Sequence, residues 1–358
     1  MNSNNVYHFF MSATTPKGFV SHLSSLANQM EYKNSLIIKG GAGSGKSTLI
    51  KRTAEKLKNE NYCELIHCSA DPSSLDAAVF KETSLTVIDA TAPHIVEPTL
   101  PGLAHKVVSL YNFFDNKKLD EYKSEIYRAA EGEEIYQRRA HSFLRAAGML
   151  LSSNEKLAAR CINKEKLINF ITRFCAREIK GKKAGVGSVK IRYLSAVSEN
   201  GILMYTDTAE KMCKKIIKID DTNSAAAPLI LEGVSKAATM AGYDVYVCLC
   251  PLSDSDKIDH LLIPELSLAV MTSNKFHPVQ IENAKTVHTS RFYDREKLSE
   301  YTMRTSFQRR AARELLKEAS VFLKKRLECH RRLDNYYVQA CDFEERDKYF
   351  DSFIEEFV

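Results

Sequence analysis

The chain has 358 residues, of which 44% are hydrophobic and 27% charged, and its net charge is +6. This composition provides apolar residues for two ordinary cores and excludes a disordered or fibrous chain. The start MNSNNVYHFF lacks the basic and apolar regions of a signal peptide, and no stretch reaches the ~18 apolar residues of a membrane span. We therefore expect a soluble, cytoplasmic protein without a membrane partner.

The cysteines and the basic residues carry no clear site. Nine cysteines are scattered along the chain and lack the Cys-x-x-Cys spacing of a zinc site, which predicts mostly buried, reduced thiols. The densest basic run, KKRLECHRR at 324–332, has helical periodicity. A solvated helix face is therefore favoured over a nucleic-acid contact.

A repeat of about 180 residues organises the chain. Blocks recur in the same order in both halves, which indicates a duplicated unit. The matching blocks are FFMSATTPKGF (9–19) with RYLSAVSENGI (192–202), ETSLTVIDATAPH (82–94) with ELSLAVMTSNKFH (265–277), and NFFDNKKLDEY (112–122) with SRFYDREKLSEY (290–301). We predict two domains, residues 1–183 and 184–358, joined near the Gly- and Lys-rich segment KGKKAGVGSVK.

Each half predicts the same series of elements. A short strand leads through an amphipathic helix to an apolar strand, a loop, a second helix and two further strands. The expected pairs are the strands 35–40 and 215–219, the helices 46–60 and 228–242, the strands 62–68 and 243–250, and the strands 85–90 and 268–273. Such alternation is typical of an α/β fold with a parallel sheet covered on both faces. Charged, periodic segments at 117–180 and 295–358 predict helical hairpins or lids attached to each sheet.

The strongest motif lies between the second strand and helix of the first half. GGAGSGKS at 40–47 fits the pattern G-x-x-x-x-G-K-[ST] in the strand-loop-helix context that a phosphate-binding loop requires. Glycines let the backbone N–H groups face an anion, and the helix N-terminus favours the same charge. The alternative is a glycine turn that binds nothing. The predicted nucleotide-binding residues are Gly40, Gly41, Ala42, Gly43, Ser44, Gly45, Lys46, Ser47 and Thr48.

Three residues have predicted roles in phosphate and metal chemistry. Lys46 is expected to reach the β and γ phosphates, and Ser47 and Asp89 are expected to hold Mg²⁺. Asp89 ends the apolar strand LTVID, and capping of a following turn is its alternative role. Ala90 follows it, so the adjacent glutamate of many ATP-driven motors is missing. This absence makes strong motor activity less expected.

A polar cluster is expected beyond the ends of the strands, where ligands of open α/β sheets bind. Asp71 and His94 are candidates to orient an attacking water or a second substrate, although a role as a turn or cap residue is favoured for each. The other members of the cluster are His67, Asp76 and Thr91. The sequence has no Asn-Lys-x-Asp or Thr-Lys-x-Asp for guanine, so ATP is favoured over GTP.

The segments KGGAGSGKST, HCSADPSSLD and IDATAPHIVEPTLPG together give the chain a wider resemblance. Over nearly its whole length it resembles bacterial proteins of about this size with two tandem P-loop NTPase domains. The resemblance implies two P-loop ATPase-like domains and ATP binding at residues 40–48. In that family the second loop can also be glycine-rich with a lysine, and this sequence departs from the pattern.

The second half keeps the setting of the loop without its chemistry. In an ungapped alignment from Ile37 on Ile216, the residues Gly45, Lys46 and Ser47 meet Ser224, Ala225 and Ala226, and further along Asp89 meets Thr272. Asp220 and Asp221 place negative charge where phosphates would lie, which is unfavourable in a partly buried site. We therefore expect a pseudo-NTPase repeat that contacts the first half. A cation site at this aspartate pair is the alternative.

Three functions fit one working loop. The first is an ATPase or an ATP-dependent switch that alters the contact between the halves. The second is a small-molecule kinase in which arginines of the 120–178 helices close over the phosphates; the candidates are Arg128, Arg138, Arg139 and Arg145. The third is a nucleotide-gated nucleic-acid-binding protein, which only the modest basic runs support.

Overall fold

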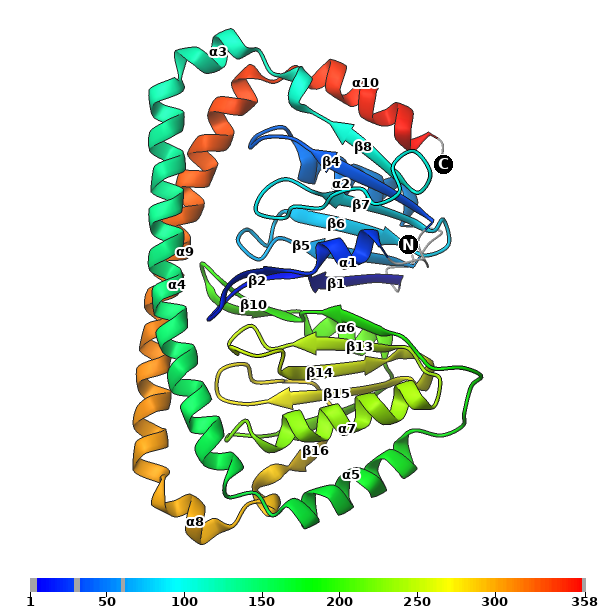
Figure 1. Ribbon diagram of the computed structural model, residues 1–358, viewed down its shortest axis with the longest axis vertical. Helices are drawn as coiled ribbons and strands as arrows, with labels where there is room; N and C mark the ends of the chain where they lie inside the picture. The colour runs from blue at the N-terminus through cyan, green and yellow to red at the C-terminus, as the bar shows by residue number, and fades with distance from the viewer. Residues whose placement is uncertain (1–4, 29–32, 59–61, 356–358) are drawn as a thin grey trace.

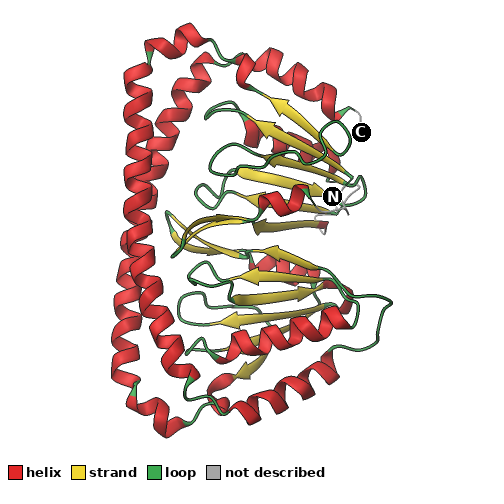
Figure 2. Ribbon diagram, viewed as in Figure 1, coloured by secondary structure: helices red, strands yellow, loops and turns green. Residues whose placement is uncertain are grey.

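The structure, a computed structural model, describes residues 5–28, 33–58 and 62–355. Two sheets lie one above the other along a pair of very long helices (Figures 1 and 2). Each half contributes one six-stranded sheet and one long helix.

The N-terminal sheet has the strand order β1-β5-β6-β7-β4-β8, and its strands are parallel except for β6. Its strands are β1 Val6–Phe10, β4 Asn34–Lys39, β5 Cys63–His67, β6 Leu75–Phe80, β7 Leu85–Asp89 and β8 His105–Ser109. The remaining elements of this half are the hairpin of β2 Ser12–Thr15 and β3 Gly18–Ser21, and the helices α1 Leu23–Ala27, α2 Lys46–Leu57, α3 Asn116–Glu121, α4 Lys123–Ala159 and α5 Lys164–Glu178.

The C-terminal sheet repeats this order as β9-β13-β14-β15-β12-β16, with β14 as the antiparallel strand. Its strands are β9 Val189–Arg192, β12 Lys215–Asp220, β13 Val245–Leu249, β14 Ile258–Ile263, β15 Leu268–Ser273 and β16 Lys285–His288. The remaining elements of this half are the hairpin of β10 Ser195–Ser198 and β11 Gly201–Met204, and the helices α6 Thr206–Met212, α7 Ala226–Met240, α8 Arg295–Glu300, α9 Thr302–Ala340 and α10 Phe343–Ile354.

The predicted α/β class, with two sheets of mostly parallel strands flanked by helices, is confirmed. The sequence did not predict the antiparallel strands β6 and β14, the edge strands β8 and β16, or the two hairpins. Strand β6 begins inside the polar segment HCSADPSSLD, which was expected to be a loop. Its small residues Ala77 and Ala78 are fully buried between two neighbouring strands. This segment therefore forms a strand because of its burial and not because of a high intrinsic β-propensity.

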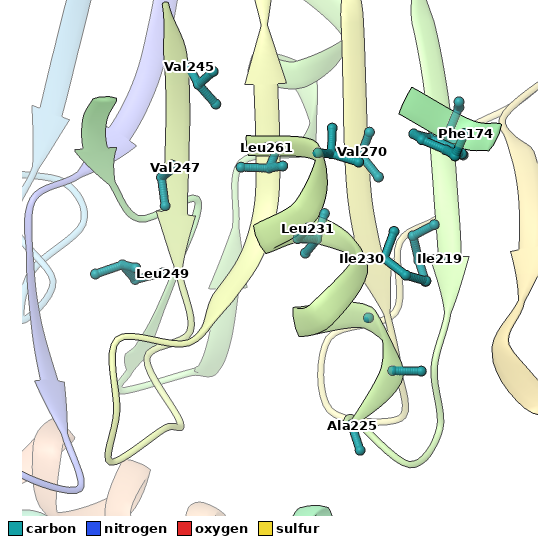
Figure 3. Close-up of a cluster of buried hydrophobic side chains, with 14 of the residues drawn as sticks. Phe174, Ile219, Ala225, Ile230, Leu231, Val245, Val247, Leu249, Leu261 and Val270 are labelled. Carbon is teal, nitrogen blue, oxygen red and sulfur yellow. The ribbon is translucent and has the colours of Figure 1, made fainter. Parts of the chain in front are cut away.

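The central strands of each sheet are apolar because both faces of the sheet are covered. In the C-terminal half, Ile230 and Leu231 of α7 lie over Leu261 and Val270 of the sheet (Figure 3). Phe174 of α5 joins the same core. Parallel sheets covered on both faces have this continuous hydrophobic character.

The long helices were expected to form separate appendages, and the structure differs. Helices α4 and α9 lie side by side along the whole molecule and form one support for both sheets (Figure 1). Ala140, Leu144 and Ala147 of α4 meet Ala312 and Leu316 of α9 in one buried cluster. Small and branched residues at helical spacing allow the two helices to pack closely.

The helices that follow this pair cross to the opposite sheet. Phe350 and Ile354 of α10 are buried in the core of the N-terminal half, against α2. Leu167 and Phe174 of α5 are buried in the core of the C-terminal half, against α7. Each sheet is therefore covered by a helix from the other sequence repeat, and residues 179–188 connect α5 to β9 without a helix or strand.

The halves meet at the edge strands β1 and β9. Phe10 and Tyr193 exchange two backbone hydrogen bonds of 2.8 Å. Beside them, Arg192 donates to Glu64 across the junction at 2.9 Å, and both side chains are fully buried. Tyr246 also donates to Glu64 at 2.7 Å. A buried pair of this kind fixes one arrangement of its partners, because separating the charges leaves one of them uncompensated.

Candidate functional site

The loop at residues 40–45 joins β4 to α2, and its backbone conformation requires glycine. Gly43 and Gly45 have φ values of +61° and +78°, in the left-handed region. A side chain at Gly45 would also collide with Arg346, since a Cβ there would lie 2.0 Å from its Nη1 atom. Ser44 is buried and donates from Oγ to the carbonyl of Gly41 at 2.9 Å. The loop is thus closed on itself and covered by later parts of the chain.

The predicted phosphate and metal residues are brought together. Lys46 begins α2, and its Nζ donates to the carbonyls of Gly40 and Gly41 at 3.0 and 2.8 Å. The same Nζ lies 3.7 Å from the carboxylate of Asp89. Ser47 accepts a hydrogen bond from the backbone N–H of Leu75 at 2.8 Å. Thr48, the last residue of the motif, is exposed on α2.

Strand pairing explains why Asp89 lies beside the loop. Strands β4 and β7 are parallel neighbours with Ile38 opposite Asp89, so both strands end at the same edge. Asp89 also accepts from the backbone N–H of Thr91 at 2.9 Å, which is the turn-capping role foreseen as its alternative. Thr91 in turn donates to the carbonyl of Gly40 at 2.9 Å.

The other members of the polar cluster, apart from Thr91, make contacts with residues outside the loop. Asp71 accepts hydrogen bonds from Ser73 and Ser74 and so stabilises its own turn. His94 faces Asp76, with 3.4 Å between Nε2 and Oδ2. His67 contacts His8 at 2.9 Å, and burial lowers the pKa of His67 to about 4. The structure therefore gives Asp71 a structural contact and pairs His94 with another residue of the cluster.

Two residues near the end of the chain contact the loop directly, and neither was predicted. Asp334 of α9 accepts a hydrogen bond from the backbone N–H of Gly43 at 2.7 Å. Arg346 of α10 donates to the carbonyl of Ser44 at 2.8 Å and is buried. Both lie about 300 residues from the loop, so no local pattern connects them to it.

Asp334 belongs to a small charged chain between the long helices. His330 lies between Glu133 of α4 and Asp334, at 3.2 and 3.6 Å. The hydrogen bond that His330 donates to Glu133 raises the pKa of His330, which favours its charged form. When protonated, His330 attracts the carboxylate of Asp334, which lies 3.6 Å from its Nε2, because opposite charges attract in a partly buried place.

The arginines proposed for a lid lie on α4 and have other contacts. Arg138 is exposed and lies 3.9 Å from Glu134, and Arg139 lies over the ring of Phe322. In the part of the chain that the structure describes, the arginine bonded to the loop is Arg346. Arg128 and Arg145 remain candidates from the sequence alone.

The second half has a loop of the same kind that is one residue shorter. Residues 221–225 connect β12 to α7, whereas residues 40–45 connect β4 to α2. The helix starts therefore align Lys46 with Ala226, one position beyond the ungapped alignment. Both alignments place an alanine opposite Lys46, either Ala225 or Ala226, so the second loop lacks the lysine in either case.

Asp221 replaces the anion at the start of α7. Its fully buried carboxylate accepts from the backbone N–H groups of Ala226 and Ala227 at 2.9 and 2.7 Å. Its other oxygen accepts from Thr289 and Tyr293 at 3.0 and 3.1 Å. Burial and the charge of Asp221 raise the pKa of Tyr293, so this hydroxyl stays a donor. An internal carboxylate thus occupies the position that a phosphate takes at a helix N-terminus.

The alternative cation site at the aspartate pair is not supported. Both oxygens of Asp221 are satisfied by donors, and Asp220 points elsewhere, with 2.9 Å from its Oδ2 to Nδ1 of His288. The cavity beside this loop measures about 40 Å³, well below the several hundred Å³ of ordinary ligand pockets. Its walls include Thr222, Asn223, Ser224, Cys250, His277 and Arg309.

Comparison with known proteins gives no further assignment. No family model, no curated protein and no solved structure matches the chain. Among the described residues, no helix combines the length and apolar character that crossing a membrane requires. The resemblance to tandem P-loop proteins and the cytoplasmic location therefore stay predictions from the sequence.

Removing the internal carboxylate should destabilise the C-terminal half. We expect Asp221→Ala to lower the free energy of unfolding by roughly 1–3 kcal/mol, because it leaves buried donors without an acceptor. Urea unfolding followed by circular dichroism measures the change. The matched control is Asp220→Ala, which breaks a half-exposed pair and should cost less than about 1 kcal/mol. Equal losses in the two variants would contradict the assignment of Asp221.

Proposed function

We propose that the chain is a P-loop NTPase that binds Mg²⁺ and ATP at residues 40–48 and uses them to switch the contact between this loop and α9. The observation that carries the proposal is the joint placement of Lys46, Ser47 and Asp89 around a glycine loop between a buried strand and a helix. The same three residue types serve phosphate and magnesium in P-loop proteins. The proposal extends to ATP hydrolysis, for which the loop would hold the phosphates and Asp89 would hold Mg²⁺.

The residues of this chain fit the proposed ligands. Lys46 has a flexible side chain that can leave the carbonyls of Gly40 and Gly41 for phosphate oxygens. Ser47 and Asp89 offer the hard oxygen ligands that Mg²⁺ prefers. When bound, Mg²⁺ would neutralise charge on the phosphates. The loop backbone and the start of α2 would orient the anion.

The switch follows from the contact of Asp334 with the loop. A phosphate and this carboxylate need the same backbone donor, the N–H of Gly43, and the two anions repel each other. Nucleotide binding therefore has to displace Asp334. Arg346, which already touches the loop, would remain to face the phosphates, as an arginine supplied in cis does.

Displacement at one loop can reach the other half through α9. Arg309 of the same helix donates to the carbonyl of Thr222 in the second loop at 3.3 Å. The two contacts are 25 residues apart on α9 (334 − 309), which is about 37 Å of helix. A continuous helix is rigid on this scale. A movement of α9 at Asp334 would therefore also change the contact of Arg309 with Thr222. The shortened loop would then serve as the responding partner.

A small-molecule kinase is the second candidate, and one observation favours it. A cavity of about 250 Å³ lies between the turn at residues 71–73 and the hairpin at 198–203, with Arg331 of α9 in its wall. An acceptor could bind there. ATP turnover in the absence of any second substrate supports the switch, whereas turnover that requires an added metabolite supports the kinase.

Lys46→Ala should weaken ATP binding at least about 100-fold, because charged hydrogen bonds to phosphate contribute about 3 kcal/mol. Isothermal titration calorimetry with Mg²⁺ and ATP measures the affinity. Lys51→Ala is the matched control, because Lys51 is an exposed lysine of the same helix, and it should bind normally. Unchanged affinity in Lys46→Ala would refute the site.

Asp334→Asn should tighten ATP binding about tenfold, since it removes a charged competitor worth about 1.4 kcal/mol. The same titration measures this change. Glu328→Gln makes the same change of charge at an exposed position of α9 and should have little effect. Weaker binding in Asp334→Asn, or equal gains in both variants, would show that Asp334 does not compete with phosphate.

A further inference from the structure

Each half contains the same trio of a cysteine, an aspartate and a histidine, and every member is buried except the half-buried Cys68. Cys68, Asp76 and His94 form the first cluster, and Cys250, Asp259 and His277 form the second. Within each cluster the sulfur, carboxylate and imidazole atoms all lie within 4.8 Å of one another. The clusters occupy equivalent places: the cysteine follows β5 or β13, the aspartate is the second residue of β6 or β14, and the histidine follows β7 or β15.

The clusters were retained while the phosphate chemistry was not. Lys46, Ser47 and Asp89 correspond to Ala226, Ala227 and Thr272 in the second half, so all three ligand-binding groups are lost there. The cysteine, aspartate and histidine are nevertheless identical in both halves, at separations of 182 and 183 residues. A role that depends on triphosphate binding does not explain this difference.

Each cluster contains a buried side-chain atom that has no hydrogen-bond partner. In the second cluster, Nε2 of His277 lies 3.0 Å from Oδ2 of Asp259, yet this oxygen has no hydrogen-bond partner. The two side chains are only 3% and 2% exposed. In the first cluster, Nε2 of His94 lies 3.4 Å from Oδ2 of Asp76, which also accepts a hydrogen bond from Ser12 at 3.1 Å, whereas Nδ1 of His94 is buried without a partner. Buried polar atoms rarely lack partners, so the unpartnered Oδ2 of Asp259 and Nδ1 of His94 require a further group.

A metal ion meets that requirement. Thiolate, imidazole and carboxylate form a ligand set of Zn²⁺, whereas Mg²⁺ prefers oxygen ligands alone. We propose that each half binds one Zn²⁺-class transition-metal ion through its cysteine, aspartate and histidine. Three protein ligands leave a fourth position open, as in catalytic zinc sites.

The second half shows where the fourth ligand would bind. Cys250 and His277 both line the cavity of about 40 Å³ beside the shortened loop. This space is larger than the 10–15 Å³ that one water requires. A water or a small anion therefore fits as the fourth ligand. This position gives the C-terminal half a ligand of its own, separate from the proposed nucleotide.

Metal analysis of the intact protein tests the proposal. The purified chain is incubated with Zn²⁺, passed through a desalting column and analysed by mass spectrometry of metals. We expect two equivalents of zinc per chain. Cys68→Ser and Cys250→Ser should each lose one equivalent, and Co²⁺ should give thiolate-to-cobalt absorption that falls by half in each variant.

Cys329→Ser is the matched control, because this half-buried thiol of α9 lies outside both clusters, and it should retain both equivalents. Asp259→Asn preserves side-chain volume and should also lose one equivalent, which separates loss of a ligand from failure to fold. Zinc well below one equivalent, without thiolate-to-cobalt absorption, would overturn the proposal and leave a hydrogen-bonded packing cluster. ATP titration of the same samples reports separately on the nucleotide site.

Discussion

The structure depends on how the chain supplies negative charge to a loop and helix start in each half. Backbone N–H groups at such a place need an acceptor, and the helix dipole favours an anion. In the C-terminal half Asp221 provides it permanently, from a buried position with four donors around it. In the N-terminal half Asp334 provides it from another helix. One loop is therefore closed by its own residue, and the other is closed by a residue of α9.

The long helices give this difference a consequence for the whole molecule. Helix α9 contacts both loops, and α5 and α10 each cover the sheet of the opposite repeat. The halves are thus joined by the crossed helices as well as by the buried pair of Arg192 and Glu64. The partner residue of the first loop belongs to α9, the longest helix in the described part of the chain, and the same helix also contacts the second loop.

The sequence predicted the elements that depend on local pattern and missed those that depend on tertiary contact. The repeat, the α/β class and the strand and helix around the glycine loop follow from periodicity and from glycine. Strand β6 was missed because its small residues indicate no strand until they are buried. Asp334 and Arg346 carry no local signal, and the two clusters were not predicted, because the cysteine, aspartate and histidine of each lie after or within different strands.

The central claim is that one loop of a duplicated fold binds triphosphate and the other cannot. Equilibrium dialysis of the full chain against labelled ATP with excess Mg²⁺ tests it most directly, because it counts bound nucleotides. The account predicts saturation at one nucleotide per chain. Saturation at two, or no binding at all, would contradict it.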